Sequence, residues 1–127
     1  MSKAIAIIDD EIDLITLFRE ALEMDGFQVC TFTVPIEAYN TLQKSLEEYS
    51  LLLSDFRMPR MNGNELCTKL MSINSQIKVI LMSAYHDVEY DKSKFTFISK
   101  PMPIAKLLKI VNETLAKESI LKDNHRT

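Results

Sequence analysis

The sequence predicts an α/β domain in which a five-stranded parallel sheet is covered by helices on both faces. Short, solidly apolar runs alternate along the chain with segments whose apolar residues recur every three or four positions. These are the patterns of buried parallel strands and of amphipathic helices. The 127 residues, 46% of them apolar and 26% charged, suit one globular domain. We therefore expect a domain over residues 1–118 and a polar, frayed tail over residues 119–127.

The first half of the chain switches regularly between the two patterns. An apolar run that ends at Asp9 predicts the first strand, and leucines and a phenylalanine at helical spacing predict a helix after it. Gly26 follows that helix, and glycine commonly ends helices. The expected elements are a strand at 4–8, a helix ending before Gly26, a strand at 27–32, a helix at 34–48 with Ile36, Tyr39, Leu42 and Leu46 facing inward, and a strand at 51–54.

The second half continues the alternation with one exception. We expect a helix from Gly63 or Asn64, strands at 77–83 and 94–99, and a last helix at 104–115 that begins after Pro103. Residues 84–94 have no helical rhythm, so only a short helix or a turn fits there. Five such strands predict a flavodoxin-like, doubly wound sheet of order 2-1-3-4-5, with its fourth helix shortened or missing.

Composition excludes several classes of protein. The net charge of −3, without a basic stripe, argues against nucleic-acid binding. Cys30 and Cys67 form neither a disulfide framework nor a metal-binding spacing, so we expect two reduced thiols. The N-terminus turns acidic too early for a signal peptide, and no apolar run approaches the ~20 residues of a membrane span. We expect a cytoplasmic protein with no membrane partner.

Residues whose side chains could bind a ligand or take part in a reaction lie where the predicted strands end. The first strand ends in Asp9 and Asp10, the third in Asp55, the fourth in Ser83 and the fifth in Lys100. Open parallel sheets bind ligands at the carboxyl ends of their strands, so these side chains should converge. Carboxylates that repel one another suit a divalent cation such as Mg²⁺, and the hydroxyl and ammonium groups could stabilise a transferring phosphoryl group.

Each of these residues also has an ordinary structural interpretation. Asp55 alone could be a cap or a loop residue, the Asp9–Asp10 pair could cap the first helix, and Lys100 could be a surface lysine. The functional interpretation is favoured because four strand ends each deliver a residue type that phosphoryl transfer requires. In that interpretation the Asp55 carboxylate is the nucleophile and becomes an acyl phosphate.

Four motifs resemble the receiver domain of two-component response regulators in order and spacing. They are "IIDDE", "LLLSDFRMPRMNG", "ILMSA" and "FISKP", and the resemblance covers the chain from about Ala4 to Leu115. It implies that Asp55 is the phosphoacceptor. It also implies an Mg²⁺ (or Mn²⁺) site formed by Asp10, Asp55 and the backbone carbonyl of Arg57, with Asp9 acting through a water.

The resemblance assigns further roles around the phosphoacceptor. Ser83 would hydrogen-bond the phosphoryl group and Lys100 would pair with it, and the Lys100–Pro101 bond would be cis. Phe97 falls on the position of the switch aromatic of this family, which turns inward when Ser83 moves toward the phosphoryl group. The alternative is that Phe97 is a core aromatic beside Phe95.

The sequence departs from the family pattern between Ser83 and Lys100. The two residues are 17 positions apart, about one helical turn fewer than usual. We therefore expect a monomer or weak dimer whose output uses another surface or a remodelled segment at 85–94. Arg57 and Tyr85 occupy positions that tune loss of the phosphoryl group in this family. They either screen it from water or point to solvent.

The leading hypothesis is a phosphorylation-dependent switch, not an enzyme beyond self-catalysed phosphotransfer and dephosphorylation. Its donor would be a histidine kinase or a phosphotransfer protein, and its downstream protein target is not indicated. The alternatives are a pseudo-receiver that works without phosphorylation, an aspartate-nucleophile phosphohydrolase and a flavin mononucleotide binder. The phosphohydrolase would need an acid where Arg57 stands, and the acids after the first strand would repel the flavin phosphate.

Overall fold

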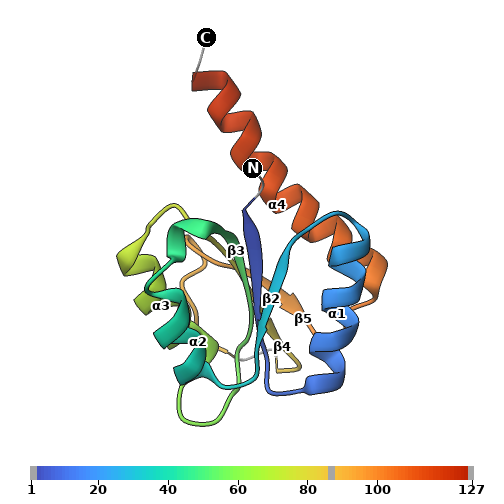
Figure 1. Cartoon of the computed structure of the whole chain (residues 1–127), viewed down its shortest axis with the longest axis vertical. Coiled ribbons are helices and arrows are strands. Elements are labelled where there is room, and N and C mark those ends of the chain that lie inside the picture. Colours follow the sequence, from blue (N-terminus) through green and yellow to red (C-terminus); the bar gives the residue numbers. More distant parts are fainter. Residues whose placement is uncertain (1–2, 86–87, 126–127) are drawn as a thin grey trace.

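A computed structural model describes residues 3–85 and 88–125, with only the backbone for 117–125. It contains one sheet and the helices that cover it (Figure 1). The elements are β1 (Ala4–Ile8), α1 (Ile12–Met24), β2 (Val29–Phe32), α2 (Pro35–Leu42), the 3₁₀ turn η1 (Leu46–Glu48), β3 (Tyr49–Asp55), α3 (Gly63–Ile73), β4 (Lys78–Ser83), β5 (Thr96–Ser99) and α4 (Ile104–His125).

The five strands are all parallel and lie in the order β2-β1-β3-β4-β5, which confirms the predicted topology. Alternate residues of each strand enter two separate cores. Ile5 and Ile7 of β1 pack toward α1 and α4, whereas Ala6 and Ile8 pack toward α2 and α3. Figure 1 shows α2 and α3 together on one face and α1 on the other. Burial on both faces explains why the central strands β1, β3 and β4 are largely apolar runs.

Gly26 ends α1 as predicted. Its φ of 94° is in the left-handed region, which glycine adopts without a steric penalty. The Gly26 N–H donates to the Glu23 carbonyl, and the Phe27 N–H donates to the Leu22 carbonyl. This pair of bonds is the Schellman motif, and it satisfies carbonyls that the end of the helix would otherwise leave free. The chain then enters β2 directly.

The expected helix at 34–48 was wrong in its extent. Helix α2 stops at Leu42, and the chain continues through η1 before β3 begins at Tyr49. The Ser45 N–H donates to the Leu42 carbonyl, three residues back, so the last turn tightens instead of continuing as an α-helix. Ile36, which we expected to face inward, is exposed, and Ala38 is buried in its place.

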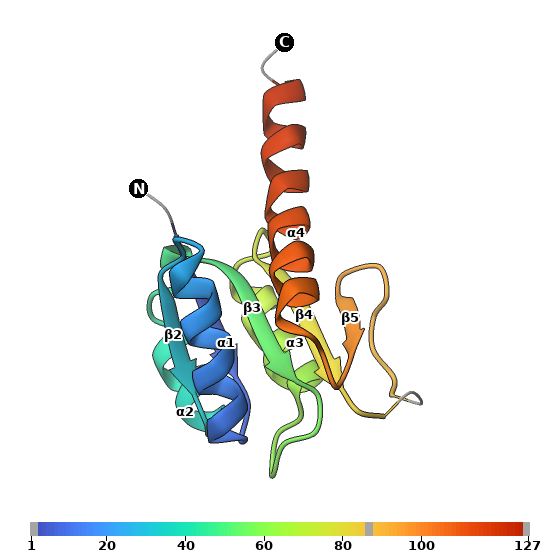
Figure 2. The same ribbon diagram turned by 90° about the vertical axis from the view of Figure 1, so that its right-hand side faces the viewer.

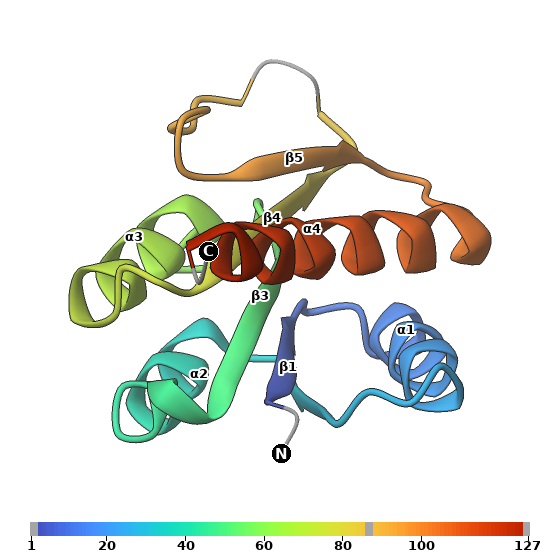
Figure 3. The ribbon, with the colours of Figure 1, turned by 90° about the horizontal axis from the view of Figure 1, so that it is seen from above.

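The segment between β4 and β5 carries no helix in its described part, residues 84–85 and 88–95, and residues 92–94 form a turn. This confirms the expected loss of the fourth helix. Phe95 is buried, and the Tyr90 ring stacks on Phe97 of β5 with centroids 5.2 Å apart. The segment therefore packs aromatic side chains against the edge strand β5 without forming a helix in its described part. Figure 3 shows it looping out beyond β5.

Helix α4 runs to His125, through most of the segment that we expected to be a frayed tail. Figure 2 shows its last turns extending past the end of the sheet. Of the described helices, none is both long and apolar enough to cross a membrane. Cys30 and Cys67 are both free thiols, Cys30 exposed and Cys67 buried. Burial raises the pKa of the Cys67 thiol to about 12, so this cysteine is protonated at neutral pH.

Candidate functional site

The sheet brings the predicted site residues to one edge. Asp55 and Ser83 are the last residues of the neighbouring strands β3 and β4, and Lys100 follows β5. Asp9 follows β1, and its backbone N–H donates to the Phe32 carbonyl of β2. The Lys100 N–H likewise donates to the Ser83 carbonyl, at 2.9 Å. These bonds continue the pairing of the strands and fix the backbone from which each functional side chain projects.

The Lys100 ammonium lies among the carboxylates. Its Nζ is 2.9 Å from Asp9 Oδ2, 3.3 Å from Asp55 Oδ1 and 3.4 Å from Glu11 Oε1. One carboxylate oxygen from each of Asp9, Asp10 and Asp55 lies within 4.8 Å of the other two. Asp9 and Asp55 are buried, whereas Asp10 is exposed. The convergence predicted from the strand ends is therefore present.

The acids carry more charge than Lys100 neutralises. Burial, and secondarily the neighbouring Asp9 carboxylate, raises the pKa of Asp55 to about 6, although Lys100 opposes the rise. Burial also raises the pKa of Asp9. Burial alone would lower the pKa of Lys100, but hydrogen bonds and charge attraction from Asp9 and Asp55 outweigh it, so that pKa is raised. This acid pocket, formed by Asp9, Asp10, Asp55 and Lys100, thus holds a charged lysine and carboxylates whose mutual repulsion the lysine only partly offsets.

This donor set fits a hard divalent cation. Mg²⁺ takes oxygen ligands and is commonly held by one or two carboxylates plus waters and phosphate oxygens. The clustered oxygens of Asp9, Asp10 and Asp55 provide such ligands, and a cation would relieve the repulsion that raises the pKa of Asp55. The family role of the Arg57 carbonyl as a further ligand stays a prediction.

A hollow of about 340 Å³ opens over the acids and is wide enough for a phosphoryl group. Its wall includes Asp10, Asp55, Ser83 and Lys100. On its rim the Arg57 guanidinium lies 4.1 Å from the centre of the Tyr85 ring, a cation–π contact. Both side chains are exposed, yet they contact each other instead of extending separately into solvent.

Ser83 is turned toward its own loop. Its hydroxyl oxygen accepts a hydrogen bond from the Tyr85 N–H at 3.0 Å, and its side chain is buried. Phe97 lies outside the hollow, half-buried against the core and stacked on Tyr90. The Lys100–Pro101 bond is cis, as expected. Whether Ser83 and Phe97 move on phosphorylation stays a prediction.

Gly63 allows α3 to begin directly against the end of β3, the strand that carries Asp55. A Cβ atom at this position would lie 2.2 Å from the carbonyl oxygen of Asp55 and 2.9 Å from the hydroxyl oxygen of Ser54. Such a distance is far below van der Waals contact, so only glycine fits. The Asn62 side chain then caps α3 by accepting a hydrogen bond from the Glu65 N–H at 2.8 Å. This turn holds the backbone of Asp55 in place.

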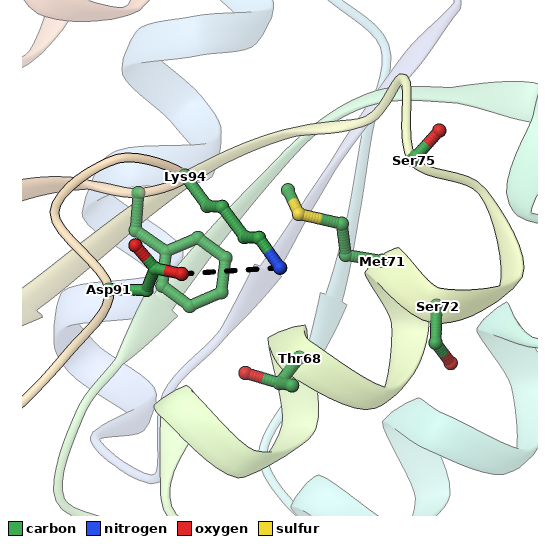
Figure 4. Close-up of a pocket in the computed structure, with 7 residues that line it drawn as sticks. Thr68, Met71, Ser72, Ser75, Asp91 and Lys94 are labelled. Atoms are coloured by element: carbon green, nitrogen blue, oxygen red, sulfur yellow. Dashed lines mark ion pairs between the residues drawn. The ribbon is translucent and has the colours of Figure 1, made fainter.

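A second hollow, of about 320 Å³, lies at the other end of the sheet. It is bounded by the second half of α3 and by the turn before β5, with Met71 and Phe95 in its wall and the Asp91–Lys94 ion pair at one side (Figure 4). Ser75 and Phe95 precede β4 and β5, so this hollow opens near the amino ends of those strands. It is therefore separate from the acid pocket.

A sequence model of the response regulator receiver domain matches residues 5–112, which are most of the chain. The chain belongs to this family. Receiver domains of this family bind Mg²⁺ at an acidic pocket and act as phosphoacceptors in two-component signalling. This receiver domain has an acidic cluster, formed by Asp9, Asp10 and Asp55, at the edge of its sheet.

Relatives of this receiver domain range from proteins of about its own length to much longer ones. Sporulation initiation phosphotransferase F of Bacillus subtilis is 28% identical over 124 residues, covering 94% of this chain and 98% of that protein. The phosphoglycerate transport system transcriptional regulatory protein PgtA of Salmonella typhimurium is 30% identical over 117 residues. The chain spans only 28% of the length of PgtA, and 27% of the length of the regulator DctD of Rhizobium meliloti.

Solved structures share the fold of this receiver domain. A CheY-like receiver domain protein from Methanospirillum hungatei superposes with a TM-score of 0.83 at 24% identity, covering 94% of this chain and 98% of that one. NtrX from Brucella abortus gives a TM-score of 0.84 at 20% identity, covering 99% of this chain and 29% of that one. Over residues 3–85 and 88–125 this receiver domain has four α-helices, one fewer than the usual five.

Sequence reasoning missed two residues near the site. Glu11 pairs with Lys100, and Tyr90 stacks on Phe97. The signal for Glu11 was its place directly after the two aspartates, where a third acid could reach the same lysine. For Tyr90 there was no usable signal, because the segment that carries it has no periodic pattern.

Proposed function

We propose that Asp55 accepts a phosphoryl group from a histidine kinase or a phosphotransfer protein, in a Mg²⁺-dependent reaction that alters partner binding. The observation that carries this proposal is the position of the Asp55 carboxylate, which is buried, faces a phosphoryl-sized hollow and is paired with Lys100. An Asp55 oxygen attacks the phosphorus of a phosphohistidine, the P–N bond breaks, and the imidazole leaves with the bonding pair and takes up a proton. The product is an acyl phosphate.

The pocket residues have distinct parts in this step. Asp10 and Asp55, with the Arg57 carbonyl and with Asp9 through a water, would hold Mg²⁺, which supplies neutralising charge to the phosphoryl oxygens. Lys100 already lies 3.3 Å from Asp55, so it can pair with a phosphoryl oxygen after a small movement. The Ser83 hydroxyl can leave its bond to the Tyr85 N–H and donate to another oxygen.

The donor protein would dock on the apolar surface beside the acid pocket. A groove of about 430 Å³ runs between α1 and the residues after β5, with Leu14, Leu17 and Met102 in its wall. The groove shares Glu11 and Lys100 with the wall of the acid hollow, and Leu17 is half exposed. A donor bound there would hold its phosphohistidine at the mouth of the hollow. Leu17→Asp should therefore reduce transfer from a donor protein but not from acetyl phosphate.

The output would pass through the segment between β4 and β5. Phe97 is held half-buried by Tyr90, and Tyr85 is held by Arg57 beside the phosphoacceptor. If Phe97 turns inward on phosphorylation, it leaves Tyr90 without its stacking partner. Hydrogen exchange with and without a phosphoryl mimic should then show reduced protection around Tyr90. Changes confined to α1 would contradict this route.

Incubation with acetyl phosphate and Mg²⁺, followed by intact-mass measurement, tests the proposal. We expect a gain of one phosphoryl group in the wild type, none without Mg²⁺ and none in Asp55→Asn. A wild type that gains no mass, or an Asp55→Asn variant that is labelled equally, would contradict the proposed function.

A further inference from the structure

The ammonium of Lys100 is shared among three carboxylates whose exposure differs sharply. The Asp9 and Asp55 side chains are 1% and 9% exposed, whereas the Glu11 side chain, with Oε1 3.4 Å from Lys100 Nζ, is 64% exposed. Asp9 and Asp55 therefore hold the lysine from within the pocket. Glu11 holds it from the solvent side, which is the side from which a phosphoryl donor arrives.

The local backbone places Glu11 in this position. Glu11 is the N-cap residue of α1, and its side chain makes no capping hydrogen bond with the described residues. Its backbone N–H instead donates to Asp9 Oδ1 at 3.0 Å. Glutamate is not a favoured N-cap residue, because Ser, Thr, Asp and Asn fit that role better. The side chain of Glu11 is thus free of the helix and is directed to Lys100.

After phosphorylation of Asp55, the Glu11 carboxylate and the phosphoryl group would compete for the N–H donors of Lys100. An ammonium has three N–H donors, and the three carboxylates around Lys100 are enough to engage all of them. A phosphoryl group on Asp55 would add anionic oxygens to the hollow that Glu11 lines. These oxygens require a Lys100 donor, and like charges repel the Glu11 carboxylate. The Lys100 ammonium therefore cannot pair fully with both the phosphoryl group and the Glu11 carboxylate.

We propose that Glu11 is a positioning residue that retains Lys100 in the unphosphorylated form and opposes the phosphorylated form. The proposal rests on the proposed function, that Asp55 is the phosphoacceptor. Glu11 acts through Lys100 and does not touch the reacting atoms. Because the Glu11 side chain is largely exposed, although Lys100 is not, its effect is about two- to fivefold, the range typical of surface ion pairs.

Beryllofluoride, an anion that mimics a phosphoryl group on a carboxylate, provides the test. It is titrated with Mg²⁺ into the wild type, Glu11→Gln and Asp13→Asn, and binding is followed by NMR. Asp13 is the matched control: it is an acid in the first turn of α1, outside the three carboxylates that pair with Lys100 in the described part of the chain. We expect Glu11→Gln to bind beryllofluoride about two- to fivefold more tightly and Asp13→Asn to be unchanged.

The salt dependence of beryllofluoride affinity distinguishes an ion-pair effect of Glu11 from a general packing effect. Raising the salt from about 0.1 M to about 1 M should remove most of the difference between Glu11→Gln and the wild type. Equal affinity of Glu11→Gln and the wild type, weaker binding by Glu11→Gln, or an equal gain in Asp13→Asn would overturn the proposal.

A metal-free measurement distinguishes failure of this proposal from failure of the proposed function. Urea unfolding of Glu11→Gln, Lys100→Met and the double variant should show that the two substitutions are coupled, whereas Asp13→Asn and Lys100→Met should be additive. Additivity of Glu11→Gln and Lys100→Met would overturn the contact itself. The two substitutions could instead be coupled while the wild type fails to bind beryllofluoride. That result would reject Asp55 as the phosphoacceptor, and with it the competition between Glu11 and the phosphoryl group for Lys100.

Discussion

Replacing Asp55 with asparagine should stabilise the metal-free protein at neutral pH. Burial and the Asp9 carboxylate raise the pKa of Asp55 from 3.8 to about 6. Between these two values the native state binds more protons than the unfolded state, so stability falls as the pH rises from about 4 to about 6. Above that range the ionised Asp55 costs the native state about 3 kcal/mol relative to its neutral form. Asparagine has nearly the same shape and never ionises.

Urea unfolding of the wild type and Asp55→Asn in a chelator, across pH 3.5 to 8, measures this cost. We expect Asp55→Asn to be more stable by up to about 3 kcal/mol near pH 7.5, with the difference vanishing near pH 4. Adding Mg²⁺ should stabilise the wild type and narrow the difference, because a bound cation neutralises the same charge. A difference that is absent at pH 7.5, or that does not change with pH, would show that the ionised Asp55 carboxylate does not destabilise the metal-free protein.

Three further predictions concern the loops around the site. Gly63→Ala should lower the stability by about 1–3 kcal/mol in urea unfolding, because its Cβ would lie 2.2 Å from the Asp55 carbonyl oxygen. An unchanged urea midpoint would contradict the close packing of Gly63 against the Asp55 backbone. Arg60→Gly should raise the stability by about 1 kcal/mol, since Arg60 has a φ of 73°, and a loss of stability would argue against strain there. Combining Arg57→Ala with Tyr85→Ala should speed decay of the phosphorylated form severalfold, because the wild-type Arg57–Tyr85 contact lies on the rim of the hollow over the acids. Unchanged decay would show that the two side chains do not screen the phosphoryl group from water.

The acid pocket could be predicted because it depends on the sheet alone. A parallel sheet places the carboxyl ends of its strands at one edge, so Asp9, Asp55 and Lys100 had to lie near one another once the strand order was known. The central strands β1, β3 and β4 were easy to place, since both of their faces are buried and their sequences are largely apolar runs.

The remaining features depend on contacts that no local pattern encodes. Helix α2 stops at Leu42 because the chain must turn into β3, although Leu46 continues the apolar rhythm. Tyr90 reaches Phe97 only through the particular path of the segment between β4 and β5. The Glu11–Lys100 pair likewise requires the side-chain geometry at the start of α1. Sequence reasoning therefore failed where contacts between distant parts of the chain decide the conformation, whether or not an apolar pattern is present.

Chemical trapping with borohydride determines whether the Asp55 side chain itself receives the phosphoryl group. The protein is treated with acetyl phosphate and Mg²⁺ and then with borohydride, which reduces an acyl phosphate to the alcohol and converts that aspartate to homoserine. Peptide sequencing by mass spectrometry should find homoserine at position 55 and aspartate at positions 9 and 10. Homoserine at position 9 or 10, or none at position 55 in protein that has gained a phosphoryl group, would show that Asp55 is not the phosphoacceptor.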